Sequence, residues 1–100
     1  MKKEEEYYYL EASLATSGLT TLAGKIMEIA KREYTGAVVS KAGLERIKDS
    51  LTFTAEALKK EHPRWKPVKI VVYSNEYTGA VHLNIDGWSF IGHKVTLFID

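Results

Sequence analysis

The dipeptide Asp86-Gly87 constrains the fold more than any other feature of this sequence. It lies between TGAVHLNI and WSFIGHKVTLFI, two segments in which apolar and polar residues alternate. Aspartate followed by glycine between such segments predicts a type I′ hairpin turn, because both central residues must tolerate a positive φ. The turn fixes which residues are paired: Ile85 with Trp88, Leu83 with Phe90, and Val81 with Gly92. The apolar members of these pairs share one face, which the rest of the chain must cover.

The apolar phase of the last strand changes after Gly92. Val95, Leu97 and Ile99 stand an odd number of positions from Phe90, so a regular strand would point them away from the hairpin's apolar face. A β-bulge inserts one extra residue on one strand and shifts the alternation by one. We therefore expect a bulge at Gly92-His93, which returns these three residues to the core.

The remaining segments complete the order of elements. Tyr7 to Leu14 alternates as a strand, and VKIVVYS, from Val68, precedes the hairpin as another. Between them, apolar residues recur at helical spacing from Leu19 to Tyr34. After a short apolar link at residues 37–39, Ser40 is the expected N-cap of a second helix that reaches about His62. The buried stripe of that helix is expected to be Leu44, Ile47, Leu51 and Leu58.

This order predicts an α+β fold with two layers. We expect one domain over residues 1–100, in which residues 1–6 form a charged, frayed lead-in. The chain runs strand, helix, helix, then a three-strand meander, which predicts a four-stranded antiparallel sheet with both helices packed on one face. The first strand lies beside either the second or the fourth strand.

Composition limits the classes of function. The chain has 100 residues, no cysteine and a formal net charge of +1. Disulfides and thiolate metal sites are therefore excluded, and the weak charge makes nucleic acid a less favoured partner. Glu4 to Glu6 occupy the place where a signal peptide needs apolar residues, and no segment approaches membrane-spanning length. We expect a cytoplasmic protein without a cofactor or a membrane partner.

The strand phases predict an aromatic surface on the sheet face opposite the helices. Tyrosine gives a large contact area at low entropic cost, and clustered exposed apolar surface is typical of interaction sites. We therefore expect a non-enzymatic domain that binds a protein partner or a second copy of itself, such as a small inhibitor or accessory protein of a mobile element. The same aromatics could instead stack the bases of single-stranded nucleic acid. This face is expected to carry Tyr7, Tyr9, Val71, Tyr73, Thr96 and Phe98, with Lys69 and Lys94.

The hexapeptide EYTGAV occurs twice, at Glu33 to Val38 and at Glu76 to Val81. Neighbouring residues do not match, so the two copies are not repeats of a larger unit. One interpretation is turn chemistry used twice, with Gly36 ending a helix and Gly79 in a turn or bulge. The other is a pair of similar loops that present Tyr34 and Tyr77 to a partner.

His82 and His93 are the strongest candidates for metal ligands. The hairpin register places them diagonally across neighbouring strands, on the face opposite Leu83. A zinc site needs at least three protein ligands, and the sequence offers no obvious third one. It also assigns no carboxylate to orient either histidine. We expect no metal site and no catalytic residue.

The order of elements is similar to that of the RelE/ParE toxin family, which has a strand, two helices and a curled antiparallel meander. The resemblance concerns topology and covers most of the chain without a matching motif. It implies cleavage of messenger RNA on the ribosome. The residues nearest to that role in phosphate binding and proton transfer are Arg64, Lys69, Tyr77, His82, His93 and Lys94.

Overall fold

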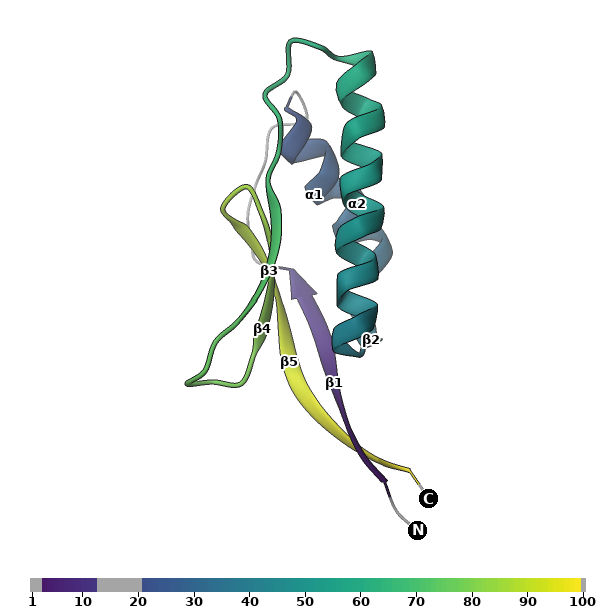
Figure 1. The fold of residues 1–100 in the computed structure, drawn as a ribbon, viewed down its shortest axis with the longest axis vertical. Helices are drawn as coiled ribbons and strands as arrows, with labels where there is room; N and C mark the ends of the chain where they lie inside the picture. The colour runs from purple at the N-terminus through teal and green to yellow at the C-terminus, as the bar shows by residue number, and fades with distance from the viewer. Residues whose placement is uncertain (1–2, 13–20, 100) are drawn as a thin grey trace.

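A computed structural model describes the backbone of residues 3–12 and 21–99, and the side chains of residues 6–12 and 21–95. Within these residues the chain forms two helices and five strands (Figure 1). In chain order they are β1 (Lys3–Ala12), α1 (Leu22–Tyr34), β2 (Val38–Val39), α2 (Lys41–Glu61), β3 (Ile70–Ser74), β4 (Val81–Ile85) and β5 (Trp88–Ile99).

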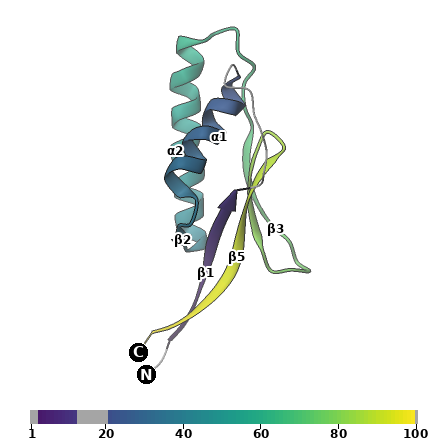
Figure 2. The same ribbon diagram turned by 180° about the vertical axis from the view of Figure 1, so that it is seen from behind.

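The described strands form one antiparallel sheet in the order β2-β1-β5-β4-β3. Both helices cover the same face of this sheet, as the views from the two sides show (Figures 1 and 2). The predicted α+β class with two helices on one face is confirmed, but the prediction of four strands was wrong. Val38 and Val39, expected as a link, pair with Tyr9 and Tyr8 and add a short fifth strand at the edge.

The predicted hairpin is confirmed residue by residue. Asp86 and Gly87 have φ values of 50° and 92°, as a type I′ turn requires. The side chain of Asn84 supports the turn, because its Oδ1 accepts a hydrogen bond of 2.9 Å from the backbone N–H of Gly87. The observed β4–β5 pairs are the expected ones, including Ile85 with Trp88 and Val81 with Gly92.

The expected bulge at Gly92-His93 is not formed. β1 pairs with β5 without interruption, from Lys3 opposite Ile99 to Ala12 opposite Phe90. β5 therefore keeps the two-residue alternation that starts at the turn. Lys94 consequently lies on the same face as Tyr8, where its Nζ is 2.8 Å from Oε1 of Glu6. The prediction that Lys94 belongs to the face opposite the helices was wrong.

β1 is longer at its start than the alternation of the sequence suggested. It begins at Lys3 rather than Tyr7 and ends at Ala12. Its first residues pair with the end of β5, so the two strands form a ribbon that extends past the helices toward both termini (Figure 1). The molecule is elongated, with principal extents of 54 × 22 × 22 Å.

Both helices begin at hydroxyl caps. Ser40 caps α2 as predicted, since its Oγ accepts a hydrogen bond of 3.1 Å from the N–H of Gly43. α1 begins at Leu22, and Oγ1 of Thr21 accepts from the N–H of Gly24 at 3.0 Å. The predicted start at Leu19 lies outside the described residues. Each cap satisfies a backbone donor that has no partner within its own helix.

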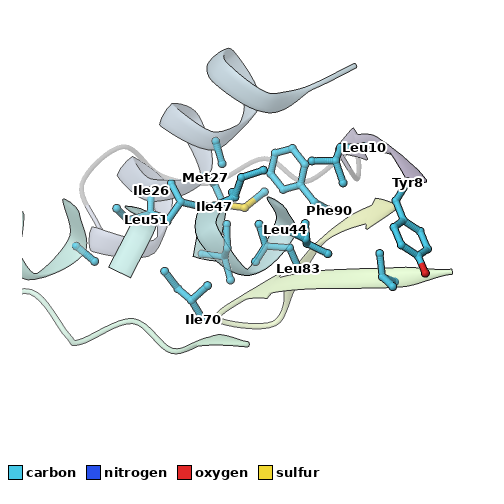
Figure 3. Packing of buried hydrophobic residues seen from close by; sticks show 14 of the residues in the cluster. Tyr8, Leu10, Ile26, Met27, Leu44, Ile47, Leu51, Ile70, Leu83 and Phe90 are labelled. Atoms are coloured by element: carbon cyan, nitrogen blue, oxygen red, sulfur yellow. The ribbon is translucent and has the colours of Figure 1, made fainter. Parts of the chain in front are cut away.

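The core lies between the helices and the sheet (Figure 3). Leu44, Ile47 and Leu51 of α2 are buried as predicted, whereas Leu58 packs only partly against the core. Ala55 takes the fourth buried position of α2, one turn beyond Leu51. The helices meet an apolar sheet surface formed by Tyr8, Leu10, Ile70, Val81, Leu83, Ile85 and Phe90.

Candidate binding surface on the open sheet face

The face of the sheet opposite the helices, called the open face here, is formed by residues that alternate with the buried ones. No described helix or strand covers it (Figures 1 and 2). Because paired residues of neighbouring strands share a face, the observed register assigns its members directly. They are Tyr7, Tyr9 and Glu11 of β1, Val71 and Tyr73 of β3, His82 and Asn84 of β4, and Ser89, Ile91, His93 and Val95 of β5.

Tyr73 and His82 form a stacked pair on this face. They lie directly opposite each other on β3 and β4, with ring centroids 4.8 Å apart and ring planes 4° from parallel. Tyr73 is 46% exposed, so much of its side chain remains accessible to solvent beside the stack. Nδ1 of His82 is buried and has no hydrogen-bond partner in the described part of the chain. The pair thus combines an apolar surface with an unsatisfied polar atom.

His93 is held by a carboxylate on the neighbouring strand. Its Nε2 lies 2.9 Å from Oε2 of Glu11, and both side chains are more than half exposed. The two residues are diagonal neighbours, because His93 pairs with Tyr9 and Glu11 pairs with Ile91. The sequence assigned no carboxylate to either histidine, and the structure places that of Glu11 beside His93. Glu11 alternates as a polar strand residue in the sequence, but nothing local reveals that its strand adjoins the one carrying His93.

Tyr9 and Tyr7 lie on the open face as predicted. Tyr9 is 43% exposed, whereas Tyr7 is partly buried. The hydroxyl oxygen of Tyr9 lies near the turn between α1 and β2. It would be 3.9 Å from a Cβ added to Gly36 in that turn. Tyr9 and Tyr73 thus mark two sides of the open face, with β5 and β4 between their strands.

Two other predicted binding residues, Tyr34 and Tyr77, lie away from this surface. Tyr34 ends α1 and packs against the core, and Tyr77 is 99% exposed in the turn between β3 and β4. Phe98 of β5 pairs with Glu4 of β1, and the side chains of both residues lie outside the described part of the structure. Thr96, also predicted for this face, belongs to the same segment, while Lys69 is exposed immediately before β3.

The two EYTGAV segments share a glycine in the left-handed region. φ is 85° at Gly36 and 74° at Gly79. Gly36 donates to the carbonyl of Leu10 at 2.8 Å, and Gly79 donates to the carbonyl of Asn75 at 2.9 Å. The prediction that both glycines serve as turn residues is confirmed, because Gly36 follows the end of α1 and Gly79 lies between β3 and β4, each at a positive φ.

The six residues considered for ribonuclease chemistry are scattered. Arg64 belongs to the connector between α2 and β3, and Tyr77 belongs to the turn at the other end of β3. Lys94 lies on the opposite face of the sheet from His82 and His93. The described residues contain no group of three or more histidine, aspartate or glutamate side chains that could hold a metal ion.

Comparisons with known proteins give no further indication. No family model matches the chain, and neither the search of characterised proteins nor that of solved structures finds a match. Neither described helix is both long and apolar enough to cross a membrane. Inferences about function therefore rest on the residues of the open face.

Proposed function

We propose that this chain is a non-enzymatic protein-binding domain that uses the open face of its sheet. The observation that carries the proposal is the pair of half-exposed tyrosines, Tyr9 and Tyr73, on a face that no described helix or strand covers. Exposed aromatic side chains that remain partly ordered by neighbours are the usual anchors of protein interfaces.

The residues between the two tyrosines also suit a protein partner. Ile91 and His82 pair with each other on adjacent strands, are each partly buried and lie between the strands of the two tyrosines. Polar groups surround this surface, including the Glu11–His93 pair. A partly apolar centre with polar groups around it is the usual arrangement of a protein interface.

The charges of the open face disfavour nucleic acid. Glu11 contributes a carboxylate close to Tyr9, and the chain as a whole carries a net charge of only +1. Lys94, expected to contact phosphate from this face, lies on the other one. Binding of single-stranded nucleic acid depends on basic residues that neutralise the backbone, in addition to aromatic stacking.

Photo-crosslinking from within the face tests the proposal. A benzophenone amino acid replaces Tyr9 in the full chain. The variant is expressed in cells of the organism whose genome encodes the protein. The matched control carries the same group at Phe53, which is 74% exposed on α2. We expect an adduct with a protein from position 9 and none from position 53. An adduct with RNA, or equal labelling from both positions, would contradict protein binding through this face.

A second candidate function is supported by the Glu11–His93 hydrogen bond. An imidazole oriented by a carboxylate is a common arrangement for general acid–base catalysis, as messenger RNA cleavage requires. On the first proposal, induced expression of the protein leaves the rate of translation unchanged. Arrest of translation by the wild-type chain, relieved by a folded His93→Gln variant, would favour the ribonuclease instead.

A further inference from the structure

β3 is an edge strand, and its hydrogen-bond register shows which backbone groups remain available. Asp86 N–H donates to Lys69 C=O at 2.8 Å, and Asn75 N–H donates to Ala80 C=O at 2.8 Å. In an antiparallel ladder, hydrogen-bonded and non-hydrogen-bonded pairs alternate. Between these two bonds, Val71 and Tyr73 must therefore direct their backbone groups toward β4. The N–H and C=O groups of Ile70, Val72 and Ser74 point away from the sheet.

No described strand pairs with β3 on that outer side. Proteins usually protect such edges with charged residues, proline, bulges or very short strands. The opposite edge follows this rule, since β2 has two residues and the part of β1 beyond it contains Glu4 to Glu6. β3 has the sequence IVVYS, which contains no charge and no proline and is rich in residues that favour strands.

We infer that β3 pairs with β3 of a second copy of this chain, antiparallel and about a two-fold axis at Val72. This interface goes beyond the proposed use of the open face, because it consists of backbone groups at the edge of the sheet. In this register Val72 faces Val72 of the second copy, and Ile70 faces Ser74. All of these residues direct their backbone groups outward, so each pair can exchange two hydrogen bonds.

The side chains are compatible with the same register. Tyr73 of one copy lies opposite Val71 of the other on the open face, and an aromatic ring beside a β-branched residue is a favourable cross-strand pair. At the two ends of the paired segment, Lys69 of one copy lies opposite Asn75 of the other. Both residues are polar, so the two-fold axis places a polar pair at each end of the interface.

Amide hydrogen exchange gives the most direct test, because the register predicts an alternating pattern. In the wild-type chain at high concentration, we expect slow exchange at Ile70, Val72 and Ser74 and a mass of twice 11.3 kDa. On dilution, these amides become fast while Val71 and Tyr73 stay protected by β4. A dimer in which the amides of Val72 and Ser74 exchange rapidly would overturn edge pairing, yet would leave binding through the open face intact. A chain that is monomeric at every concentration would also overturn it.

A matched pair of variants separates loss of the amide from loss of the side chain. Ser74 is exposed, and its N–H points outward, so Ser74→Pro removes a donor from the proposed interface without breaking the β3–β4 ladder. We expect Ser74→Pro to raise the dimer dissociation constant by roughly tenfold or more, since the two-fold axis removes the bond twice. Ser74→Ala, which keeps the amide, should stay within about twofold of wild type. Equal dimerisation of the proline and alanine variants would contradict the inference.

Discussion

Gly92 lies directly opposite Val81 in the β4–β5 ladder, so close that a Cβ on Gly92 would come within 2.6 Å of Cγ2 of Val81. The same Cβ would lie 3.0 Å from Cβ of Tyr8 on the other neighbouring strand. Side chains from β1 and β4 thus close over the glycine from both sides. Gly92 therefore provides space for packing in a regular strand, and this role accounts for a glycine at the position where the sequence suggested a bulge.

Replacing Gly92 with alanine should lower the free energy of unfolding by about 1–3 kcal/mol, because the added methyl group overpacks a buried site. Urea denaturation measures the change. Val81→Ala removes the methyl group that the new Cβ would strike, so the double variant should lose less than the sum of the two single losses. A Gly92→Ala variant as stable as wild type would show that the neighbouring strands leave space for a methyl group at this position.

Gly87→Val should lower the free energy of unfolding by more than about 1 kcal/mol, since φ is 92° at Gly87 and a β-branched residue is strained there. The cost is conformational, because a Cβ at Gly87 would meet no atom within 4 Å. Gly87→Asn is the matched control, as asparagine tolerates this region better. Thermal unfolding should rank wild type first, asparagine second and valine last; equal melting temperatures would refute the strain.

Leu51→Ala should cost roughly 2–5 kcal/mol, because Leu51 is fully buried in α2 and its truncation leaves a cavity. Phe53→Ala, on the exposed side of the same helix, should change stability by less than about 0.5 kcal/mol. Chemical denaturation of both variants provides the comparison. Similar losses for the two would mean that α2 buries a different face.

Ser40→Ala should destabilise the protein by about 1 kcal/mol, because the N–H of Gly43 loses its acceptor at the start of α2. Ser40→Asp keeps an acceptor in the same place and should retain most of the stability. Equilibrium unfolding in guanidinium chloride distinguishes the two. If aspartate costs as much as alanine, Ser40 stabilises the helix by some means other than capping.

Glu11→Ala should change the free energy of unfolding by less than about 1 kcal/mol, although it removes the partner of His93. Both side chains are more than half exposed, and solvent screens such pairs. Thermal unfolding with and without added salt measures the contribution. A loss above about 2 kcal/mol would identify the pair as structural and would weaken its use as support for a catalytic role.

Local signals in the sequence determined a large part of this fold. The Asp86-Gly87 turn set the register of β4 and β5, because a type I′ turn leaves few alternatives for the flanking residues. The Ser40 cap followed from the preference for serine just before a helix, and the burial of Leu51 followed from helical spacing. The places of Tyr9 and Tyr73 on the open face followed from strand alternation, while their role in binding stays a prediction.

Other features were decided by the tertiary structure. Alternation indicates that Glu11 is on a polar strand face, but it cannot say which strand adjoins β1. The hydrogen bond between Glu11 and His93 therefore depends on the pairing of β1 with β5. Gly92 is compatible in sequence with a bulge or with close packing. The contacts of Val81 and Tyr8 decide for packing, because these side chains fill the space that a Cβ would need. That choice keeps β5 regular and places Lys94 on the face opposite the one predicted. Long-range pairing depends on which surfaces fit together in three dimensions, and the local pattern of a strand contains no record of its neighbour.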